Sequence, residues 1–238
     1  NKLQLNAAEV DLHDWSEIIS RMKNPNQKIN IGIIGKYIES KDAYLSINES
    51  LKHGGGALGV KVCIKPIEAE KIQEQNVEKY LGELDGVLIP GGFGNRGIEG
   101  KIIAARYARE NNIPFFGICL GMHTAVIEFA RNAAGMVGAH STEFNPETPF
   151  PIIHLLPDQR TKKDLGGTMR LGNYRCQLKT NTKSYSLYQQ EEIMERHRHR
   201  YELNSEYIHQ LEKSGMIMVG FNPEFQVVEM VELFNHPW

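Results

Sequence analysis

The chain has 238 residues, of which 41% are hydrophobic and 24% are charged, and its formal net charge is −2. This composition supports a sizeable core and excludes a disordered chain, while the low net charge argues against binding to nucleic acid or a membrane surface. The three cysteines, Cys63, Cys119 and Cys176, are far apart and odd in number, so neither a disulfide framework nor a zinc site is expected and a cytoplasmic location is predicted. No apolar run approaches transmembrane length. Because the chain begins with Asn1 rather than methionine, we expect it to be a piece of a longer protein.

In chain order, a short linker segment is predicted to precede one large domain. Residues 1–28 are polar and contain one helix, around residues 14–22, with Trp15, Ile18 and Ile19 on its apolar face. Residues 29–238 form the domain, which opens with alternating strands and helices. The predicted strands are residues 29–34, 60–67, 86–89 and 113–116, and the predicted helices are residues 42–53, 77–84, 98–110 and one that follows Cys119.

This alternation predicts an α/β fold with a doubly wound, mostly parallel sheet. Ligands of such sheets bind beyond the carboxyl ends of the strands. Asp42 is the expected N-cap of the first helix of the domain, and Gly54-Gly55-Gly56 is expected to end that helix.

From about Gly135 the pattern changes to short strand-like runs separated by turn residues. The runs cover residues 152–156, 168–171, 174–178, 196–202, 216–220 and 227–233. We interpret them as antiparallel strands that extend or flank the parallel sheet at the C-terminal end of the domain.

Cys119 lies where a buried strand turns sharply into a helix. Its neighbours Gly117 and Gly121 permit a tight turn and close packing of the helix, and the pattern is similar to a nucleophile elbow with cysteine in the place of serine. The N-terminus of the helix is expected to favour a thiolate. A small structural cysteine at the end of a strand fits the same pattern, so the motif alone leaves both interpretations open. Cys63 and Cys176 fall inside strands, where core packing is the expected role.

One glycine-rich loop has three competing explanations. The pattern Gly92-x-Gly94-x-x-Gly97 follows a strand and precedes a helix, as a dinucleotide-binding fingerprint does. The next strand leads to Cys119 rather than to the acidic residue that would hold a ribose, so we discount a dinucleotide site. The loop is better suited to offer N–H groups that form an oxyanion hole with the N–H of Leu120. From the loop alone, an ordinary glycine-rich connection is favoured.

Two further segments carry unusual residues. In residues 195–202, a strand would place three arginines on one face and two histidines on the other. The histidines are potential metal ligands without an evident third partner, and the arginines suit a phosphate or a substrate carboxylate. A charged strand satisfied by its own salt bridges is favoured in the absence of other evidence. In residues 164–172, glycines around a short apolar core predict either a lid or a hairpin.

Taken together, these motifs resemble the glutaminase domain of the CTP synthases, a group of class I glutamine amidotransferases. The matching residues are Gly35-Lys36-Tyr37, Asp42-Ala43-Tyr44, Pro90-Gly91-Gly92-Phe93-Gly94, Arg96-Gly97, Glu99-Gly100, Gly117-Ile118-Cys119-Leu120-Gly121-Met122, Ser141-Thr142-Glu143-Phe144, Gly166-Gly167-Thr168-Met169-Arg170-Leu171-Gly172 and Arg196-His197-Arg198-His199-Arg200-Tyr201-Glu202. They cover nearly the whole chain in the family's order. The elbow alone would indicate only a class I glutamine amidotransferase, whereas the last two blocks are specific to CTP synthases.

The resemblance implies a flavodoxin-like fold and a glutaminase mechanism. Cys119 would attack the side-chain amide of glutamine, ammonia would leave, and water would release glutamate from a glutamyl thioester. The implied site needs no metal. The implied oxyanion hole is Gly92 and Leu120, the implied glutamine contacts are Gly92, Phe93, Leu120, Gly121, Met122, His123, Glu143 and Arg200, and the implied lid is residues 166–172. Glu143 would meet the substrate ammonium and Arg200 its carboxylate.

The resemblance also implies partners outside the chain. In the full enzyme, ammonia would pass to a synthetase domain that aminates UTP to CTP with ATP and Mg²⁺, and GTP would activate through the lid. The glutaminase domain itself would hold no cofactor. Residues 1–28 resemble the segment that joins the two domains, and the full enzyme would be a cytoplasmic homo-oligomer, expected to be a tetramer.

Two features depart from the family pattern. His123 stands where the family usually has glutamine, so one substrate contact differs. The family's general base is the histidine of a His-Pro-Glu motif, expected shortly after residues 235–238, so the C-terminal end of the domain is expected to be incomplete and a chain without the motif impaired. His236-Pro237 matches an earlier His-Pro of the family.

Two other functions remain open on the residues. One is a different cysteine hydrolase on the same scaffold, such as a γ-glutamyl hydrolase, against which the two CTP-synthase-like blocks argue. The other is a non-catalytic regulatory or binding module, which the expected lack of His-Pro-Glu would favour.

Overall fold

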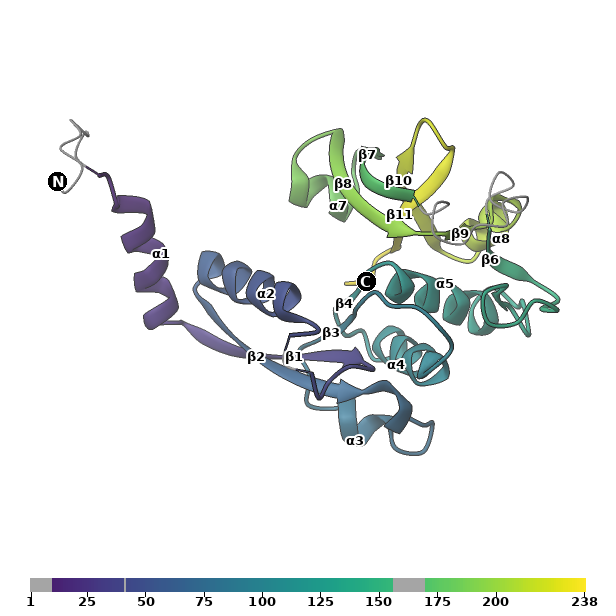
Figure 1. The fold of residues 1–238 in the computed structure, drawn as a ribbon, viewed down its shortest axis with the longest axis horizontal. Coiled ribbons are helices and arrows are strands. Elements are labelled where there is room, and N and C mark those ends of the chain that lie inside the picture. The colour runs from purple at the N-terminus through teal and green to yellow at the C-terminus, as the bar shows by residue number, and fades with distance from the viewer. Residues whose placement is uncertain (1–9, 41, 156–169) are drawn as a thin grey trace.

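The computed structural model describes residues 10–40, 42–155 and 170–238, and its elements fall into a parallel and an antiparallel part (Figure 1). The parallel part is a four-stranded sheet with the order β2-β1-β3-β4. Its strands are β1 Gln27–Gly35, β2 Val60–Glu68, β3 Gly86–Ile89 and β4 Phe115–Gly117. The connecting helices are α2 Leu45–Leu58, α3 Val77–Leu81, α4 Ile98–Glu110 and α5 Leu120–Asn132. The predicted α/β fold with a parallel sheet is therefore confirmed.

The C-terminal part supplies an antiparallel sheet with the order β11-β10-β7-β8. Its strands are β7 Arg170–Leu178, β8 Glu192–His199, β10 Met216–Asn222 and β11 Val227–Leu233. A smaller sheet joins β5 His140–Ser141, β6 Pro151–Leu155 and β9 Tyr201–Leu203, and two short helices, α7 Lys183–Tyr188 and α8 Ile208–Lys213, complete this part. The predicted antiparallel extension is confirmed, and it faces the α5 side of the parallel sheet (Figure 1).

Helix α2 differs from its prediction at both ends. It begins at Leu45 with Tyr44 as its N-cap, rather than at Asp42, and it continues through the glycine run to Leu58. Gly59, with φ of 67°, ends it in the left-handed conformation. Gly55 and Gly56 serve close packing, since a Cβ atom on Gly55 would lie 2.6 Å from the carbonyl oxygen of Val60 and one on Gly56 would lie 2.7 Å from Cγ of Met22. Tertiary contact with the preceding helix thus overrides the helix-breaking tendency of glycine.

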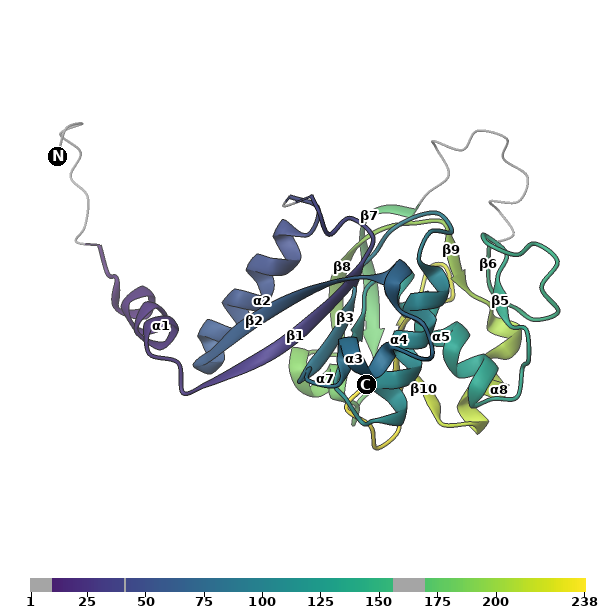
Figure 2. The ribbon, with the colours of Figure 1, turned by 90° about the horizontal axis from the view of Figure 1, so that it is seen from below.

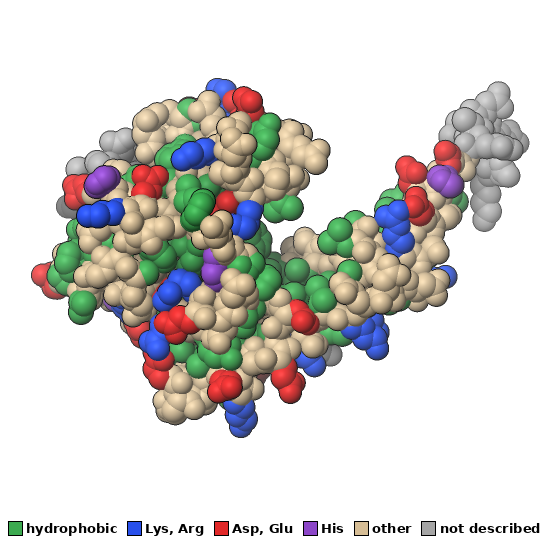
Figure 3. Space-filling view, turned by 180° about the vertical axis from the view of Figure 1, so that it is seen from behind, with side chains coloured by type: hydrophobic (Ala, Val, Ile, Leu, Met, Phe, Trp, Pro, Cys, Tyr) green, Lys and Arg blue, Asp and Glu red, His purple; other side chains and the backbone are tan. Residues whose placement is uncertain are grey.

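The preceding helix, α1 His13–Lys23, confirms the predicted N-terminal helix and extends away from the sheets (Figures 1 and 2). None of its residues is buried, and Trp15 is 66% exposed. Seen from behind, it forms an arm that projects from the body (Figure 3). No helix among the described residues combines the length and the apolar character needed to cross a membrane.

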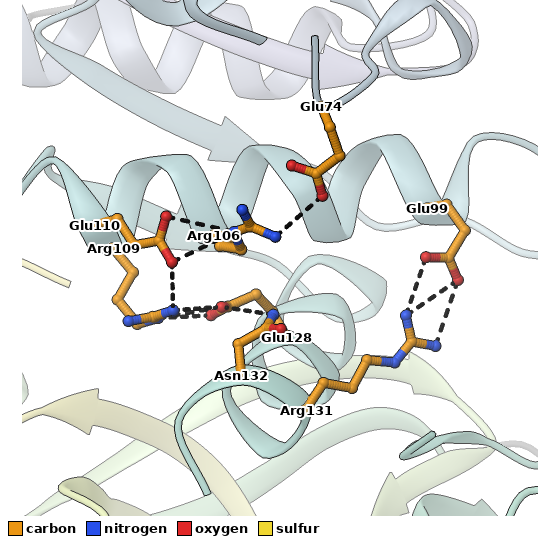
Figure 4. A network of polar contacts seen from close by, with 8 residues as sticks. All are labelled: Glu74, Glu99, Arg106, Arg109, Glu110, Glu128, Arg131 and Asn132. Carbon is orange, nitrogen blue, oxygen red and sulfur yellow. Dashed lines mark hydrogen bonds and ion pairs between the residues drawn. The ribbon is translucent and has the colours of Figure 1, made fainter. Parts of the chain in front are cut away.

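A polar network joins α4 to α5 (Figure 4). The Glu128 carboxylate is fully buried and accepts hydrogen bonds from Nε and Nη2 of Arg109 at 2.8–3.1 Å and from Nδ2 of Asn132 at 3.2 Å. The bonds to Glu128 raise the pKa of Arg109, although burial of the guanidinium acts to lower it. Glu110, at the surface, accepts a longer bond of 3.3 Å from the same guanidinium.

We expect Glu128→Gln to lower the free energy of unfolding by roughly 2–4 kcal/mol, because it leaves the Arg109 charge without its buried partner. Glu110→Gln is the matched control; it removes a carboxylate that is 47% exposed and should cost no more than about 1 kcal/mol. Urea denaturation of the two variants checks the difference. Equal losses would mean that the buried pair contributes no more than a surface pair.

Candidate active site

The elbow predicted around Cys119 forms where β4 ends and α5 begins. Cys119 is the N-cap of α5 and has φ of 54° and ψ of −108°, a conformation that a residue with a Cβ atom rarely adopts. The two flanking glycines are required by packing. A Cβ atom on Gly121 would lie 2.0 Å from the carbonyl oxygen of Ile89, and one on Gly117 would lie 2.5 Å from the backbone carbon of Gly121. The strand-to-helix turn around Cys119 is therefore confirmed.

The surroundings of Cys119 disfavour a resting thiolate. Burial raises the pKa of the thiol to about 11, and the carboxylates of Glu202 and Glu143 act in the same direction. The backbone N–H of Leu120 and the ammonium of Lys101 lower it by less. The expected help from the helix N-terminus is thus outweighed by desolvation, and at neutral pH Cys119 is a thiol that must lose its proton during attack.

A cavity of about 350 Å³ opens beside Cys119 and gathers most of the predicted side chains. It is lined by Phe93, Cys119, His123, Glu143, Arg198, His199, Arg200 and Tyr201. These residues come from four segments: the loop after β3, the elbow, the turn after β5, and the junction of β8 and β9. The fold therefore brings a nucleophile, a carboxylate and a guanidinium to one small space.

Glu143 and Arg200 form a pair of opposite charges in the cavity, and Arg198 adds a second guanidinium to its lining. The Glu143 carboxylate accepts a hydrogen bond from the N–H of Gly94 at 3.2 Å. Burial raises its pKa, while the Gly94 N–H, Lys36 and Arg200 lower it. A zwitterionic amino acid is the type of ligand that such a pair suits.

Arg200 reaches the cavity because the predicted strand of residues 196–202 is interrupted. Strand β8 ends at His199 and β9 starts at Tyr201 in a different sheet, so the single continuous strand was a wrong prediction. Within β8 the predicted alternation holds, with Arg196 and Arg198 exposed and the histidines half-buried. The break at Arg200 removes that one arginine from the exposed row.

The glycine loop after β3 lies directly against the elbow. A Cβ atom on Gly91 would be 3.5 Å from Cβ of Cys119, and one on Gly92 would be 3.6 Å from Cδ2 of Leu120. The loop is therefore within reach of the position where an oxyanion would form. Gly121 faces β3, as described above, and Met122 lines a second, larger cavity.

That second cavity has a volume of about 630 Å³ and continues from Cys119 along the outer side of β4. Its walls include Phe116, which is 63% exposed, and the edge-on aromatic pair of Phe115 and Trp238, whose ring centroids lie 5.0 Å apart. Apolar side chains are also seen in the recess between the two parts of the body (Figure 3). Strand β4 is the last strand of the parallel sheet among the described residues, so this cavity borders its open edge.

The pairing of several charged residues behind the site was not identified from the sequence. A buried charge network stands behind the cavity wall: Arg170 donates to Glu202 at 2.8 Å and to Glu229 at 2.6 Å. His199 Nε2 lies 2.8 Å from Glu202, and His197 Nε2 lies 3.1 Å from Glu229. Burial by itself would raise the pKa of Glu202, but the interactions with His199 and Arg170 outweigh it and lower that pKa. Arg170 was predicted only as part of the lid and Glu229 was not singled out, so the charged composition of residues 195–202 was the main sequence signal.

The histidines of the described chain are potential metal ligands. Within the described ranges, no group of three or more His, Cys, Asp or Glu side chains has the arrangement that would hold a metal ion. His123 is buried, and burial together with His199 lowers its pKa to about 4. His236 lies outside the Cys119 cavity, with Nε2 2.8 Å from the carbonyl oxygen of Arg109.

The predicted lid, residues 166–172, lies partly outside the described residues. Its first four residues, Gly166, Gly167, Thr168 and Met169, are the ones outside. Its last three residues, Arg170, Leu171 and Gly172, begin β7 and pair with β8 opposite His199, Arg198 and His197. The described part of that segment is therefore a strand anchored through Arg170, whose side chain is 3% exposed.

Comparisons with known proteins agree with this geometry. The family model of "Glutamine amidotransferase class-I" matches residues 39–237. The CTP synthases of Bacillus velezensis and Clostridium acetobutylicum are 51% and 52% identical to the chain over 236 and 237 residues. The match covers 99% and 100% of this chain but 44% of each of those proteins, so the chain spans less than half of their length.

Among solved structures, the glutaminase domain of Trypanosoma brucei CTPS with bound acivicin superposes with a TM-score of 0.80. It is 36% identical in sequence, and the match covers 86% of this chain and 81% of that one. From its elbow, its charged cavity and these relatives, the chain belongs to the class I glutamine amidotransferase family, and within it to the glutaminase domains of the CTP synthase type.

Proposed function

We propose that this chain is the glutamine-hydrolysing part of a CTP synthase, which supplies ammonia for the ATP-dependent amination of UTP. The observation that carries the proposal is the cavity that combines Cys119, Glu143 and Arg200. Its volume and its charges of opposite sign suit free glutamine. The similarity to CTP synthases along the whole chain supports the assignment of the ammonia to CTP formation.

In the proposed reaction, the Cys119 sulfur attacks the side-chain carbonyl carbon of glutamine. The Gly92 and Leu120 N–H groups stabilise the oxyanion, the C–N bond breaks, and ammonia leaves after taking up a proton. Water then attacks the thioester, restoring the thiol and releasing glutamate. Since the thiol has a pKa of about 11, the attack requires a base to accept its proton.

For that base we propose the histidine of the family's His-Pro-Glu motif. An effective general base has a pKa near the working pH. His123, with a pKa of about 4, is therefore a poor candidate despite lining the cavity. The larger cavity lies beside Cys119 and along the open edge of β4. Such a histidine would reach the Cys119 thiol through this cavity.

For substrate recognition we propose that Glu143 binds the α-ammonium group and Arg200 the α-carboxylate. Phe93, Gly121, Met122 and His123 would surround the side chain. In the intact enzyme we further propose a synthetase domain that binds ATP and Mg²⁺, activation by GTP through residues 166–172, a homo-oligomeric (tetrameric) assembly, and a cytoplasmic location that suits the free cysteines. Residues 1–28, including α1, would connect the two domains.

Comparing substrates tests the proposal most directly. The intact protein should release ammonia from free glutamine and leave a γ-glutamyl peptide uncleaved. Preference for the peptide would favour a γ-glutamyl hydrolase. Failure to act on either substrate would favour a binding module.

Arg200→Ala should raise the KM for glutamine by about 10- to 100-fold with little change in kcat. A charge-assisted hydrogen bond to the carboxylate contributes roughly 1.5–3 kcal/mol, and it is made equally in the ground and transition states. Arg196→Ala is the matched control, because Arg196 lies on the same charged run but outside the smaller cavity. Steady-state glutaminase kinetics provide the measurement. An unchanged KM in Arg200→Ala would assign the charged run to salt bridges alone.

A further inference from the structure

Lys36 is a nearly buried lysine at the carboxyl end of β1. Its exposed fraction is 8%, and its ammonium group donates to the carbonyl oxygen of Phe93, in the glycine loop after β3. A buried charge is stable only where hydrogen bonds replace water. Here the partner is a neutral carbonyl in the loop that borders Cys119, 57 residues away in the chain.

The peptide that joins Phe93 to Gly94 is held at both ends. Lys36 binds its carbonyl oxygen, and Glu143 accepts a hydrogen bond from its N–H at 3.2 Å. Because the C=O and N–H bonds of a planar trans peptide point in opposite directions, holding both fixes the direction of that axis in the loop. The N–H of Gly92, the proposed oxyanion donor, belongs to the Gly91–Gly92 peptide, two peptide groups earlier in the same short loop.

The loop needs such support because it has little of its own. Gly91, Gly92 and Gly94 have no side chains to pack, and Phe93 is 50% exposed. Lys36 itself is anchored through its backbone: its N–H donates to the hydroxyl of Tyr44 at 3.2 Å, and its carbonyl accepts from Nη2 of Arg96 at 2.8 Å. The support therefore runs from the parallel sheet to the loop.

We propose that Lys36 is a positioning residue for glutamine hydrolysis. By holding the Phe93–Gly94 peptide together with Glu143, it restrains the short loop that carries the Gly92 N–H, keeps that donor near the oxyanion position, and couples the loop to the carboxylate that meets the substrate ammonium. This inference rests on the proposed glutaminase function and adds a residue that acts through the loop rather than on the substrate.

The test replaces Lys36 with methionine, which keeps the apolar stem and removes the donor. Lys28→Met is the control, on the exposed start of the same strand. In the intact protein, well below the unfolding temperature of each variant, Lys36→Met should lower kcat for glutamine by about 10- to 100-fold, less than the roughly 10²–10³-fold cost of removing an oxyanion donor outright, because the donor is displaced rather than lost. Lys28→Met should match the wild type, and Lys36→Arg should recover part of the activity.

A second readout separates positioning from a charge effect on the thiol. Iodoacetamide alkylates Cys119 by displacement at carbon, without an oxyanion, so its rate in Lys36→Met should stay within about two-fold of the wild type if the loop is what changes. An alkylation rate that falls in parallel with kcat, or a kcat equal to that of the wild type, would overturn the role of Lys36. If Lys36→Met does not fold, Lys36→Arg decides. A reduced kcat with a normal alkylation rate supports the positioning role, whereas a wild-type kcat, or a loss of kcat and alkylation together, overturns the proposal. Absence of glutamine hydrolysis by the wild type itself would instead contradict the proposed function.

Discussion

Cys119→Ala should abolish glutamine hydrolysis, with kcat falling by at least about 10⁴-fold, because no acyl-enzyme can form without the nucleophile. A glutamine-analogue diazo-ketone should label Cys119 in the wild type and leave Cys119→Ala unlabelled. Mass spectrometry of the intact and digested protein locates the label. Glutamine binding should persist, since the charges of Glu143 and Arg200 remain in the cavity.

Cys63→Ala and Cys176→Ala are the controls. Cys176 is fully buried, and burial together with Glu229 raises the pKa of its thiol to about 12. Neither replacement should reduce labelling. A label found on Cys63 or Cys176, or turnover that survives Cys119→Ala, would contradict the assignment of the nucleophile.

Of the single methyl groups that could be added in the site, the one in Gly121→Ala should cause the largest loss of stability and activity. The added Cβ would lie 2.0 Å from the carbonyl oxygen of Ile89, and backbone cannot yield as a flexible side chain does. The start of α5 must therefore move away from β3, which should cost about 1–3 kcal/mol of stability. Because a displacement of the order of 1 Å at the reacting centre is enough for a 10²-fold loss, kcat should fall by about 10²-fold or more.

Gly54→Ala separates this clash from a general effect of replacing glycine. Gly54 lies inside α2, and a Cβ atom there would meet nothing within 4 Å. That variant should keep full activity and gain about 0.5–1 kcal/mol of stability from the better helix former. Thermal unfolding and glutaminase assays of the two variants provide the comparison. Full activity in Gly121→Ala would show that the elbow tolerates a wider spacing from β3.

Local signals in the sequence were sufficient for the parallel sheet and the elbow. Periodic apolar residues mark the strands and helices, and Gly117 and Gly121 mark the sharp turn at Cys119. These features depend on neighbours a few residues apart, which a sequence displays directly. The same reasoning failed at α2, where the packing of Met22 on Gly56 decides the length of the helix.

The site's supporting groups depend on pairings that the sequence does not display. Arg170 meets Glu202 and Glu229, which are 32 and 59 residues away. Lys36, at the end of β1, donates to the carbonyl oxygen of Phe93, in the loop after the neighbouring strand β3. Each of these residues would pass for an ordinary surface charge in the sequence, and only the fold shows that it is buried and paired.

The backbone of Cys119 has a consequence for how this protein can evolve. A residue with a Cβ atom at φ of 54° and ψ of −108° carries a conformational cost of roughly 1–3 kcal/mol, which glycine would not incur. Selection for heat resistance alone would therefore favour glycine at position 119, and selection for ammonia production opposes it. Stability and chemistry therefore compete at this one residue. A stabilising mutation elsewhere in the fold raises the free energy of unfolding further above the level that function requires, and so helps the protein to tolerate the strained cysteine.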